Sequence, residues 1–416
     1  MRRLRFAVLF TLALGLFAST QGSARPVAAL ASSLDRATAD RPDDVSGPQV
    51  HFLYVLPADG VDRAFDTGGQ VAAMVGAAQR WLFSKTGLSL KLDKYQGQLD
   101  VSFLRLQESG SSLAALGPRI ADRIGEEIHG AGFGAGPDSK KYVAMYDGPS
   151  QGCGYANWPP VVPGNIAIVS VLAACGPDTD YSVRAILHEV FHTFGEVPMS
   201  APHQSGNGHV TDDPNDLMWG GSYVAPLEST VIDADHADYW NDLQAQANGG
   251  FLERNAYANL KVKVTGDGSI VSGSGFGGSV DCADSCSYVV ERGQLMLTAQ
   301  PNTGSRFVGW SGACSGQGAC TLTVNGDQAV SAAFAPSLPK SWALQVLIRG
   351  RGMVNGAPGG PCSKSCVRMI PEGKKVTLTA VPAGGWKFVK WTGCPSRCSL
   401  ALVRRKIVTA TFVKKK

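Results

Sequence analysis

A short pattern of histidine and glutamate near the middle of the chain constrains the fold most strongly. It is the run His-Glu-Val-Phe-His from His188 to His192. Residues 181–187, just before it, carry apolar side chains at helical spacing, which predicts an α-helix. Side chains four residues apart share one face of a helix. The two imidazoles are therefore expected side by side, as two ligands of one Zn²⁺ must be.

The residues around the histidines fit the same chemistry. Glu189 follows the first histidine directly, so its carboxylate is expected beside the metal without occupying the ligand face. A carboxylate in that place suits a general base that takes a proton from an activated water molecule. Gly195 is expected to end the helix, because glycine adopts positive φ at low cost.

A hydrolytic zinc site needs a third protein ligand and keeps a fourth position open. We expect His203 to be that ligand, because a neutral imidazole binds zinc well and the loop must turn back toward the helix. His209 is the alternative histidine in the same loop. A carboxylate is the remaining possibility. The candidates are Asp212, Asp213 and Asp216.

The N-terminal residues read as an export signal. Residues 1–24 combine a basic start, an apolar run too short to span a bilayer stably and a small-residue end. They hold no cysteine, which argues against a lipid anchor. We therefore expect a soluble, secreted protein. Residues 25–47 are polar, show no period and are expected to be a linker or a pro-segment.

All ten cysteines follow the predicted signal peptide. An even number of cysteines in an exported chain indicates disulfides in preference to a zinc ribbon. We expect Cys153 to pair with Cys175 beside the metal site. The other eight lie close together in pairs, which favours local bridges. They are Cys282, Cys286, Cys314, Cys320, Cys362, Cys366, Cys394 and Cys398.

The mature chain has two regions with different sequence patterns. Between residues 48 and 250, short apolar strands alternate with long helical stretches, which predicts an α+β domain. Besides the histidine helix, helical spacing covers residues 67–85, 111–133 and 233–247. We expect this domain to carry the metal site.

The second region is a repeat of short predicted β-strands and Gly/Ser turns. Cys282 and Cys362 are 80 positions apart, and Trp310 recurs as Trp391, 81 positions on. Each repeat is expected to be a small all-β module with two disulfides, because its core is too small to be stable without reinforcement. The two modules span residues 258–336 and 340–413.

Charge is unevenly distributed along the chain. The formal net charge is +4, yet residues 340–416 hold sixteen Lys and Arg side chains against one acid, Glu372. The rest of the mature chain is therefore acidic. A strongly basic end favours an anionic partner such as a cell-envelope polymer. A solvated basic face with no partner is the alternative.

The pattern His188-Glu189-x-x-His192-x-x-Gly195, with Met218 further along, resembles the metzincin-like clan of secreted bacterial zinc metallopeptidases. The resemblance implies a zincin fold in which Met218 forms an apolar turn beneath the metal. Pro198 departs from the pattern, since it stands where metzincins place their third ligand.

The two repeats have a resemblance of their own. Trp310-Ser-Gly-Ala-Cys314 and Trp391-Thr-Gly-Cys394 resemble bacterial repeat modules related to internalin B-repeats. That resemblance implies adhesion or spacing at a surface, and no chemistry.

Together these features predict a secreted zinc endopeptidase. Zinc would polarise a water molecule and the scissile carbonyl, and Glu189 would act as the general base on a protein or peptide substrate. The alternative is a surface-binding or adhesive protein whose zincin-like domain is inactive.

Overall fold

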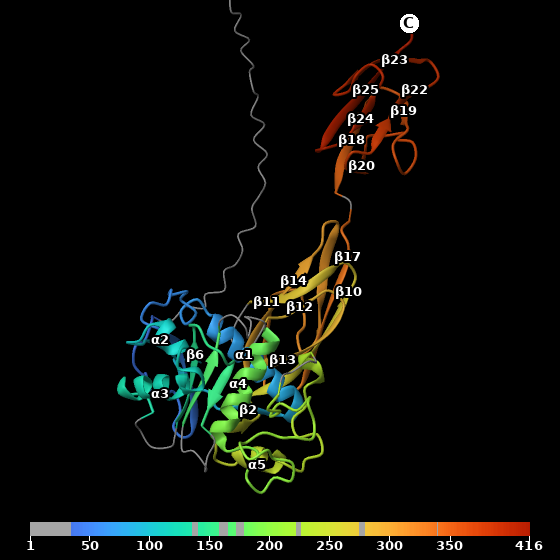
Figure 1. Cartoon of the computed structure of the whole chain (residues 1–416). Coiled ribbons are helices and arrows are strands. Elements are labelled where there is room, and N and C mark those ends of the chain that lie inside the picture. The colour runs from blue at the N-terminus through green and yellow to red at the C-terminus, as the bar shows by residue number, and fades with distance from the viewer. Residues whose placement is uncertain are drawn as a thin grey trace, which may run out of the picture. The chain divides into compact units, whose positions relative to one another are not determined.

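The computed structural model describes residues 35–134, 140–157, 165–171, 179–221, 226–273, 279–338 and 340–416 (Figure 1). The predicted signal peptide lies outside these residues. The chain divides into two compact units. The first runs to Val264 and also includes Ser269–Gln300 and Gly309–Ala332. The second comprises Thr265–Gly268, Pro301–Val308 and Ala333–Lys416.

A five-stranded sheet organises the N-terminal region, in the order β5-β1-β6-β8-β7. The strands are β1 (Gln49–Leu56), β5 (Val101–Arg105), β6 (Lys140–Tyr146), β7 (Gly154–Ala156) and β8 (Ile166–Ser170). Neighbours pair in parallel except β7, which runs antiparallel to β8 and forms one edge. An antiparallel strand can follow its neighbour through a short connection, whereas parallel strands need long crossovers.

Helices cover both faces of this sheet, which explains why every residue of β1 is buried. Successive strand residues point to opposite faces. Phe52 and Tyr54 belong to the apolar core that also includes residues of α1 (Gln70–Thr86) and α4 (Thr179–Phe194). Leu53 and Val55 instead share a core with Ile124 of α3 (Ile120–Gly130).

Two of the expected helices are shorter than the spacing predicts. The stretch 111–133 is broken into α2 (Gly110–Ala114), a 3-10 turn η1 (Gly117–Arg119) and α3. The break falls at Gly117-Pro118, where Gly117 has φ +58° and Pro118 lacks an N–H for the helix. In the stretch 233–247, only α5 (Trp240–Gln246) is helical. In both stretches the apolar residues keep helical spacing across a turn. The spacing therefore predicted longer helices than the structure has.

The remaining short elements of this region connect the main ones. They are β2 (Leu88–Leu90), β3 (Lys94–Tyr95), β4 (Gln98–Leu99), η3 (Leu227–Ser229) and β9 (Leu252–Arg254). Strand β2 pairs with β9, so the end of the domain lies beside the strand that follows its first helix.

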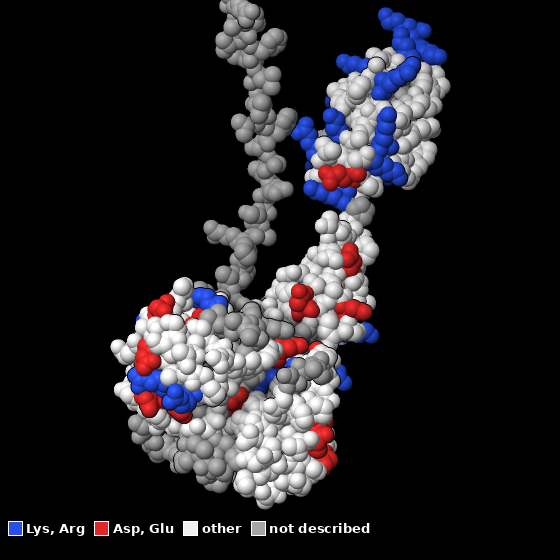
Figure 2. Space-filling model, viewed as in Figure 1, with Lys and Arg blue, Asp and Glu red and all other residues white. Residues whose placement is uncertain are grey.

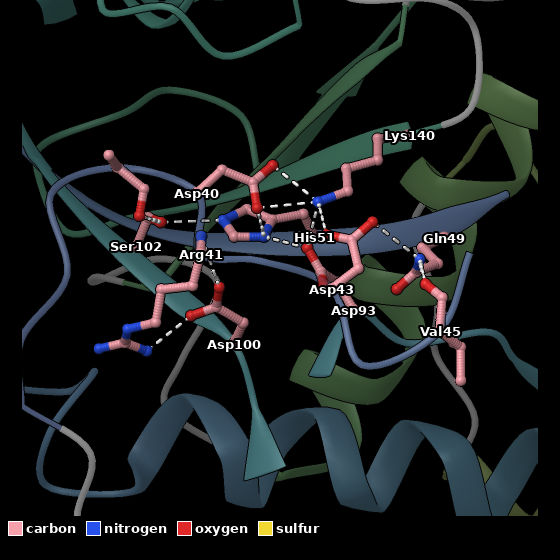
Figure 3. Close-up of polar contacts among 11 residues, drawn as sticks. Asp40, Arg41, Asp43, Val45, Gln49, His51, Asp93, Asp100, Ser102 and Lys140 are labelled. Carbon is pink, nitrogen blue, oxygen red and sulfur yellow. Dashed lines mark hydrogen bonds and ion pairs between the residues drawn. The ribbon is translucent and has the colours of Figure 1, made fainter. Parts of the chain in front are cut away.

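Residues 35–47, the described part of the predicted linker or pro-segment, pack along the sheet (Figure 3). Ala37 bridges in parallel to Ser102 of β5. The Nζ atom of Lys140 lies 2.7 Å from one carboxylate oxygen of each of Asp40, Asp43 and Asp93. These ion pairs hold the segment against β6. Its role as a linker or a pro-segment stays a prediction.

The first repeat forms two four-stranded sheets, in the orders β13-β10-β17-β15 and β12-β11-β14-β16. Its strands are β10 (Tyr257–Thr265), β11 (Gly268–Ser272), β12 (Asp281–Cys282), β13 (Ser285–Glu291), β14 (Gly293–Pro301), β15 (Ser305–Gly312), β16 (Cys320–Val324) and β17 (Gln328–Pro336). Strand β13 also contacts the α/β region, where Glu291 pairs with Lys94. Much of this repeat accordingly belongs to the first compact unit.

The second repeat builds the equivalent sheet in the order β20-β18-β25-β23. Two smaller sheets, β19-β22 and β21-β24, complete the module. Its strands are β18 (Ser341–Arg349), β19 (Gly352–Asn355), β20 (Cys366–Pro371), β21 (Lys375–Thr377), β22 (Thr379–Pro382), β23 (Trp386–Thr392), β24 (Ser399–Ala401) and β25 (Lys406–Lys414). The expected order of a domain of helices and strands followed by all-β repeats is confirmed. The first domain is α/β, with a mostly parallel sheet, where the sequence predicts α+β.

The predicted local disulfides are present in both repeats. They are Cys282–Cys286, Cys314–Cys320, Cys362–Cys366 and Cys394–Cys398. Cys153 is also disulfide-bonded. Its predicted partner, Cys175, lies outside the described residues. Among the described residues, no helix has the length and apolar character needed to cross a bilayer.

Candidate metal centre

Helix α4 brings the two motif histidines together as the spacing predicts. The Nε2 atoms of His188 and His192 are 3.1 Å apart, and both side chains are buried. The helix ends before Gly195, whose φ is +81°. Glycine is suited to this turn because a Cβ atom would strain the left-handed conformation.

A third histidine completes a triangle with the helical pair. The Nε2 atom of His209 lies 3.2 Å from Nε2 of His188 and 3.2 Å from Nε2 of His192. Tetrahedral zinc with Zn–N bonds of about 2.0–2.1 Å requires nitrogen atoms roughly 3.3 Å apart. The three nitrogens therefore fit one zinc ion.

The expectation that His203 lies beside the helical pair is wrong. Its backbone N–H donates to Oδ1 of Asp238 at 2.8 Å, and its Nδ1 lies 3.1 Å from Oδ2 of the same carboxylate. The Asp238 side chain is buried, so this contact holds His203 in place. The same carboxylate raises the pKa of His203.

The loop geometry explains why the later histidine reaches the site. Gln204 and Val210 form an antiparallel bridge, so the chain reverses between them. Gly206 and Gly208 have φ of +92° and +81°, which allows the tight turn. His209 returns beside the helix, one position before the bridge. The Gly-Asn-Gly sequence of the turn was a usable signal for this reversal.

The three candidate aspartates have other partners. Asp212 lies 3.5 Å from Nδ1 of His203, and Asp213 accepts the N–H of Asn215. Asp216 is buried and accepts hydrogen bonds from the backbone of Met218 and the hydroxyl of Tyr239. The structure brings none of them into the histidine triangle.

Hydrogen bonds to the other ring nitrogen orient two of the histidines. Nδ1 of His188 lies 2.7 Å from the carbonyl oxygen of Leu217, and Nδ1 of His209 lies 2.9 Å from Oδ1 of Asn207. A ring that donates from Nδ1 keeps its Nε2 lone pair available for a metal. These contacts set the tautomer that zinc requires.

Burial also keeps the three rings neutral. Desolvation, opposed by the Leu217 hydrogen bond, lowers the pKa of His188 to about 4. Desolvation and the neighbouring rings lower the pKa of His192, and desolvation lowers that of His209. Neutral imidazole is the form that coordinates metal, so the three rings can bind a cation without first losing a proton.

Glu189 is buried next to the edge strand β7. A Cβ atom at Gly154 of β7 would overlap the side chain of Glu189, so a larger residue there would displace the carboxylate. Desolvation raises the pKa of Glu189 to about 8. Sequence reasoning missed Gly154, for which the single signal was a glycine within a strand.

Met218 lies in the loop that follows the triangle. Its side chain is buried in the core that contains α4, and its carbonyl accepts the N–H of Val210. The neighbouring carbonyl of Leu217 is the one that holds His188. The turn thus supports the site through its backbone, whereas the expected role of the Met218 thioether stays a proposal.

Comparison with known families identifies the C-terminal modules. Residues 261–338 and 353–416 match the family model described as "Divergent InlB B-repeat domain". This match confirms the kind of repeat that the sequence resembles. Among curated proteins, none matches the chain.

Several solved structures are weakly similar. An archaemetzincin from Methanopyrus kandleri shares 17% identity over 48% of this chain and 96% of its own, with a TM-score of 0.28. OgpA from Akkermansia muciniphila shares 13% identity over 85% and 92%, with a TM-score of 0.30. Streptococcal SHIRT domains 3–4 from a cell surface protein share 13% over 37% and 96%, with a TM-score of 0.19. The functional assignment therefore depends on the geometry of the site.

Proposed function

We propose that residues 48–250 form a secreted, metzincin-like zinc endopeptidase domain. The observation that supports this most strongly is the triangle of Nε2 atoms from His188, His192 and His209, with Glu189 next to it in sequence and in the same buried region. Three neutral imidazoles, with water in the fourth position, are one of the donor sets of catalytic zinc.

Bound zinc would supply a Lewis acid that activates water and polarises a carbonyl group. The protein itself supplies the proton transfer. Glu189 would accept a proton from the attacking water and later donate it to the leaving amine.

The edge strand gives the substrate a place to bind. Strand β7 pairs with β8 on one side. Among the described residues, no strand pairs with its other side. An extended peptide can add to such an edge through backbone hydrogen bonds. Because Gly154 of β7 touches Glu189, a peptide held there would lie beside the proposed base.

The other parts of the chain are consistent with export. Four described disulfides and the InlB-like repeats fit an extracellular or surface protein. We assign the repeats to binding or spacing at an anionic surface. The Lys and Arg side chains of the second repeat, blue in Figure 2, support this assignment.

The decisive variant is Glu189→Gln, which keeps the shape of the side chain and removes the base. We expect zinc content equal to wild type and casein cleavage reduced roughly 10²–10⁴-fold, the usual contribution of a general base. Zinc is measured by elemental analysis of the purified protein. Cleavage at the wild-type rate would rule out this role for Glu189.

A matched pair of histidine variants tests the ligand set. His209→Ala should lose zinc and activity together, whereas His203→Ala should keep both, since His203 lies with Asp238. The reverse result would restore His203 as the third ligand.

The alternative function is surface attachment by the repeats with an inactive zincin-like domain. It is favoured by the excess of basic residues in the second repeat. Purified protein that holds no zinc and cleaves no peptide would support this alternative.

A further inference from the structure

The second repeat exposes one face of its four-stranded sheet. Alternate residues of β18 and β25, including Leu344, Val346 and Val408, point into the module core. The residues between them point to the opposite face. Cross-strand pairing identifies that outer face, because directly paired residues share a side. Gln345 of β18 pairs with Val367 of β20 and with Ile407 of β25.

This outer face carries large apolar side chains in contact with water. Val367 and Met369 of β20 are 55% and 59% exposed, and Ile407 and Val413 of β25 are 47% and 38% exposed. The row Val367, Gln345 and Ile407 crosses three adjacent strands. Val367, Met369 and Ile407 are neighbours on this face, whereas Val413 lies about 20 Å further along β25. Grouped exposure of the first three marks an interaction surface, unlike single exposed apolar residues.

Cations lie on the same face. Lys387 and Lys390 of β23 pair with Val413 and Thr411 of β25. The guanidinium of Arg405 donates to Oε1 of Gln345 at 3.0 Å, which places it over the apolar row. The four strands contain no acidic residue. The face is therefore both apolar and positively charged.

The first repeat provides an internal comparison, because its sheet has the same strand order. Aligning the shared cysteines places Ser287 where the second repeat has Val367. Aligning the shared phenylalanines of the last strand places Ala329 at Ile407 and Ala335 at Val413. The first repeat thus forms the equivalent sheet with small or polar side chains at these positions. At Met369 the same cysteine alignment places Val289, so the contrast between the repeats lies at Val367, Ile407 and Val413.

We propose that this outer face of the second repeat docks on a lipid bilayer that contains anionic lipids. Apolar side chains among lysines and arginines suit the boundary between acyl chains and headgroup phosphates. A soluble polyanion would need the cations alone. The proposal rests on the proposed attachment of the repeats to an anionic surface, and it names the surface.

The test uses the full chain and vesicles of phosphatidylcholine and phosphatidylglycerol in a sedimentation assay. The variant Val367→Ser with Ile407→Ala introduces the residues of the first repeat. We expect binding to fall at least tenfold, because both insertion points are removed. Circular dichroism should be unchanged, and Met369→Ser serves as a second variant on the same face.

A pair of charge variants locates the face. Lys387→Gln with Lys390→Gln should weaken vesicle binding roughly tenfold or more. Lys374→Gln with Lys375→Gln removes the same charge near β21, on a different sheet, and should retain most of the binding.

Two results would overturn the proposal. One is the absence of binding to anionic vesicles at low salt. The other is equal loss from both lysine pairs with no effect of the Val367 and Ile407 changes, which would indicate a polyanion attracted by net charge. The Glu189→Gln protein should bind vesicles like wild type, so this outcome is independent of the peptidase test.

Discussion

Gly154 shows how much a single backbone position can decide. It lies on the edge strand β7, and its missing side chain leaves the volume that Glu189 occupies. A buried carboxylate with a raised pKa needs a defined environment, because small displacements change its solvation. One methyl group in this place would move the proposed base.

We expect Gly154→Ala to reduce peptide cleavage by at least tenfold while zinc content stays at the wild-type level. The new methyl group displaces the carboxylate of Glu189, and misplacement of a catalytic group by about 1 Å can cost roughly 10²-fold. The measurement is kcat on casein together with elemental analysis.

Gly125→Ala is the matched control for this substitution. A Cβ atom at Gly125 in α3 meets nothing within 4 Å. This change should leave cleavage unaltered and stabilise the fold by up to about 1 kcal/mol, as expected for alanine replacing glycine in a helix. Equal activity losses in both alanine variants would contradict the close-approach argument.

At the scale of elements, the reversal between Gln204 and Val210 determines which histidine joins the helix. Helix α4 supplies two ligands through its own spacing, but the third depends on how a loop folds back. The loop carries two glycines in the left-handed region, so its turn is tight and His209 has a defined position.

We expect Gly206→Ala to weaken zinc binding about fivefold to tenfold. Its φ of +92° is costly for alanine, roughly 1–2 kcal/mol, although a Cβ atom there would meet no neighbour. Zinc affinity is measured by competition with a chelator.

Gly206→Asn tests whether backbone strain is the cause of the expected loss. Asparagine tolerates positive φ better than alanine, so this variant should bind zinc more tightly than Gly206→Ala. If asparagine weakens binding as much as alanine does, the turn is not what positions His209.

At the scale of the whole molecule, the two compact units are stabilised in different ways. The first contains the large core of the α/β region and the candidate metal centre. The second has a smaller core with two disulfides, Cys362–Cys366 and Cys394–Cys398. Small β-modules commonly require such reinforcement.

We expect the double variant Cys394→Ser with Cys398→Ser to destabilise the second unit by about 2 kcal/mol, the value for a short closed loop. Calorimetry should show one unfolding transition shifted downward. Removal of zinc by a chelator should shift the other transition instead, because the metal binds the first unit. Movement of both transitions under each treatment would show that the units unfold together.

The sequence by itself determined the features that depend on local spacing. Two histidines one helical turn apart, the glycine that ends their helix and the local disulfides all follow from distances along the chain, and the structure has them. The apolar composition of residues 50–56 likewise predicted a buried strand. Short-range geometry depends on a few dihedral angles, so residue order is enough to predict it.

Only the tertiary structure decided the contacts between distant segments. His209 and not His203 lies at the helical pair because Asp238, 35 residues further along the chain, holds His203. Gly154 accommodates Glu189 because β7 packs against α4. The outer face of the second repeat is visible only once strands β20, β18 and β25 are placed side by side. Long-range packing depends on the shape of the whole core, which spacing along the chain does not contain.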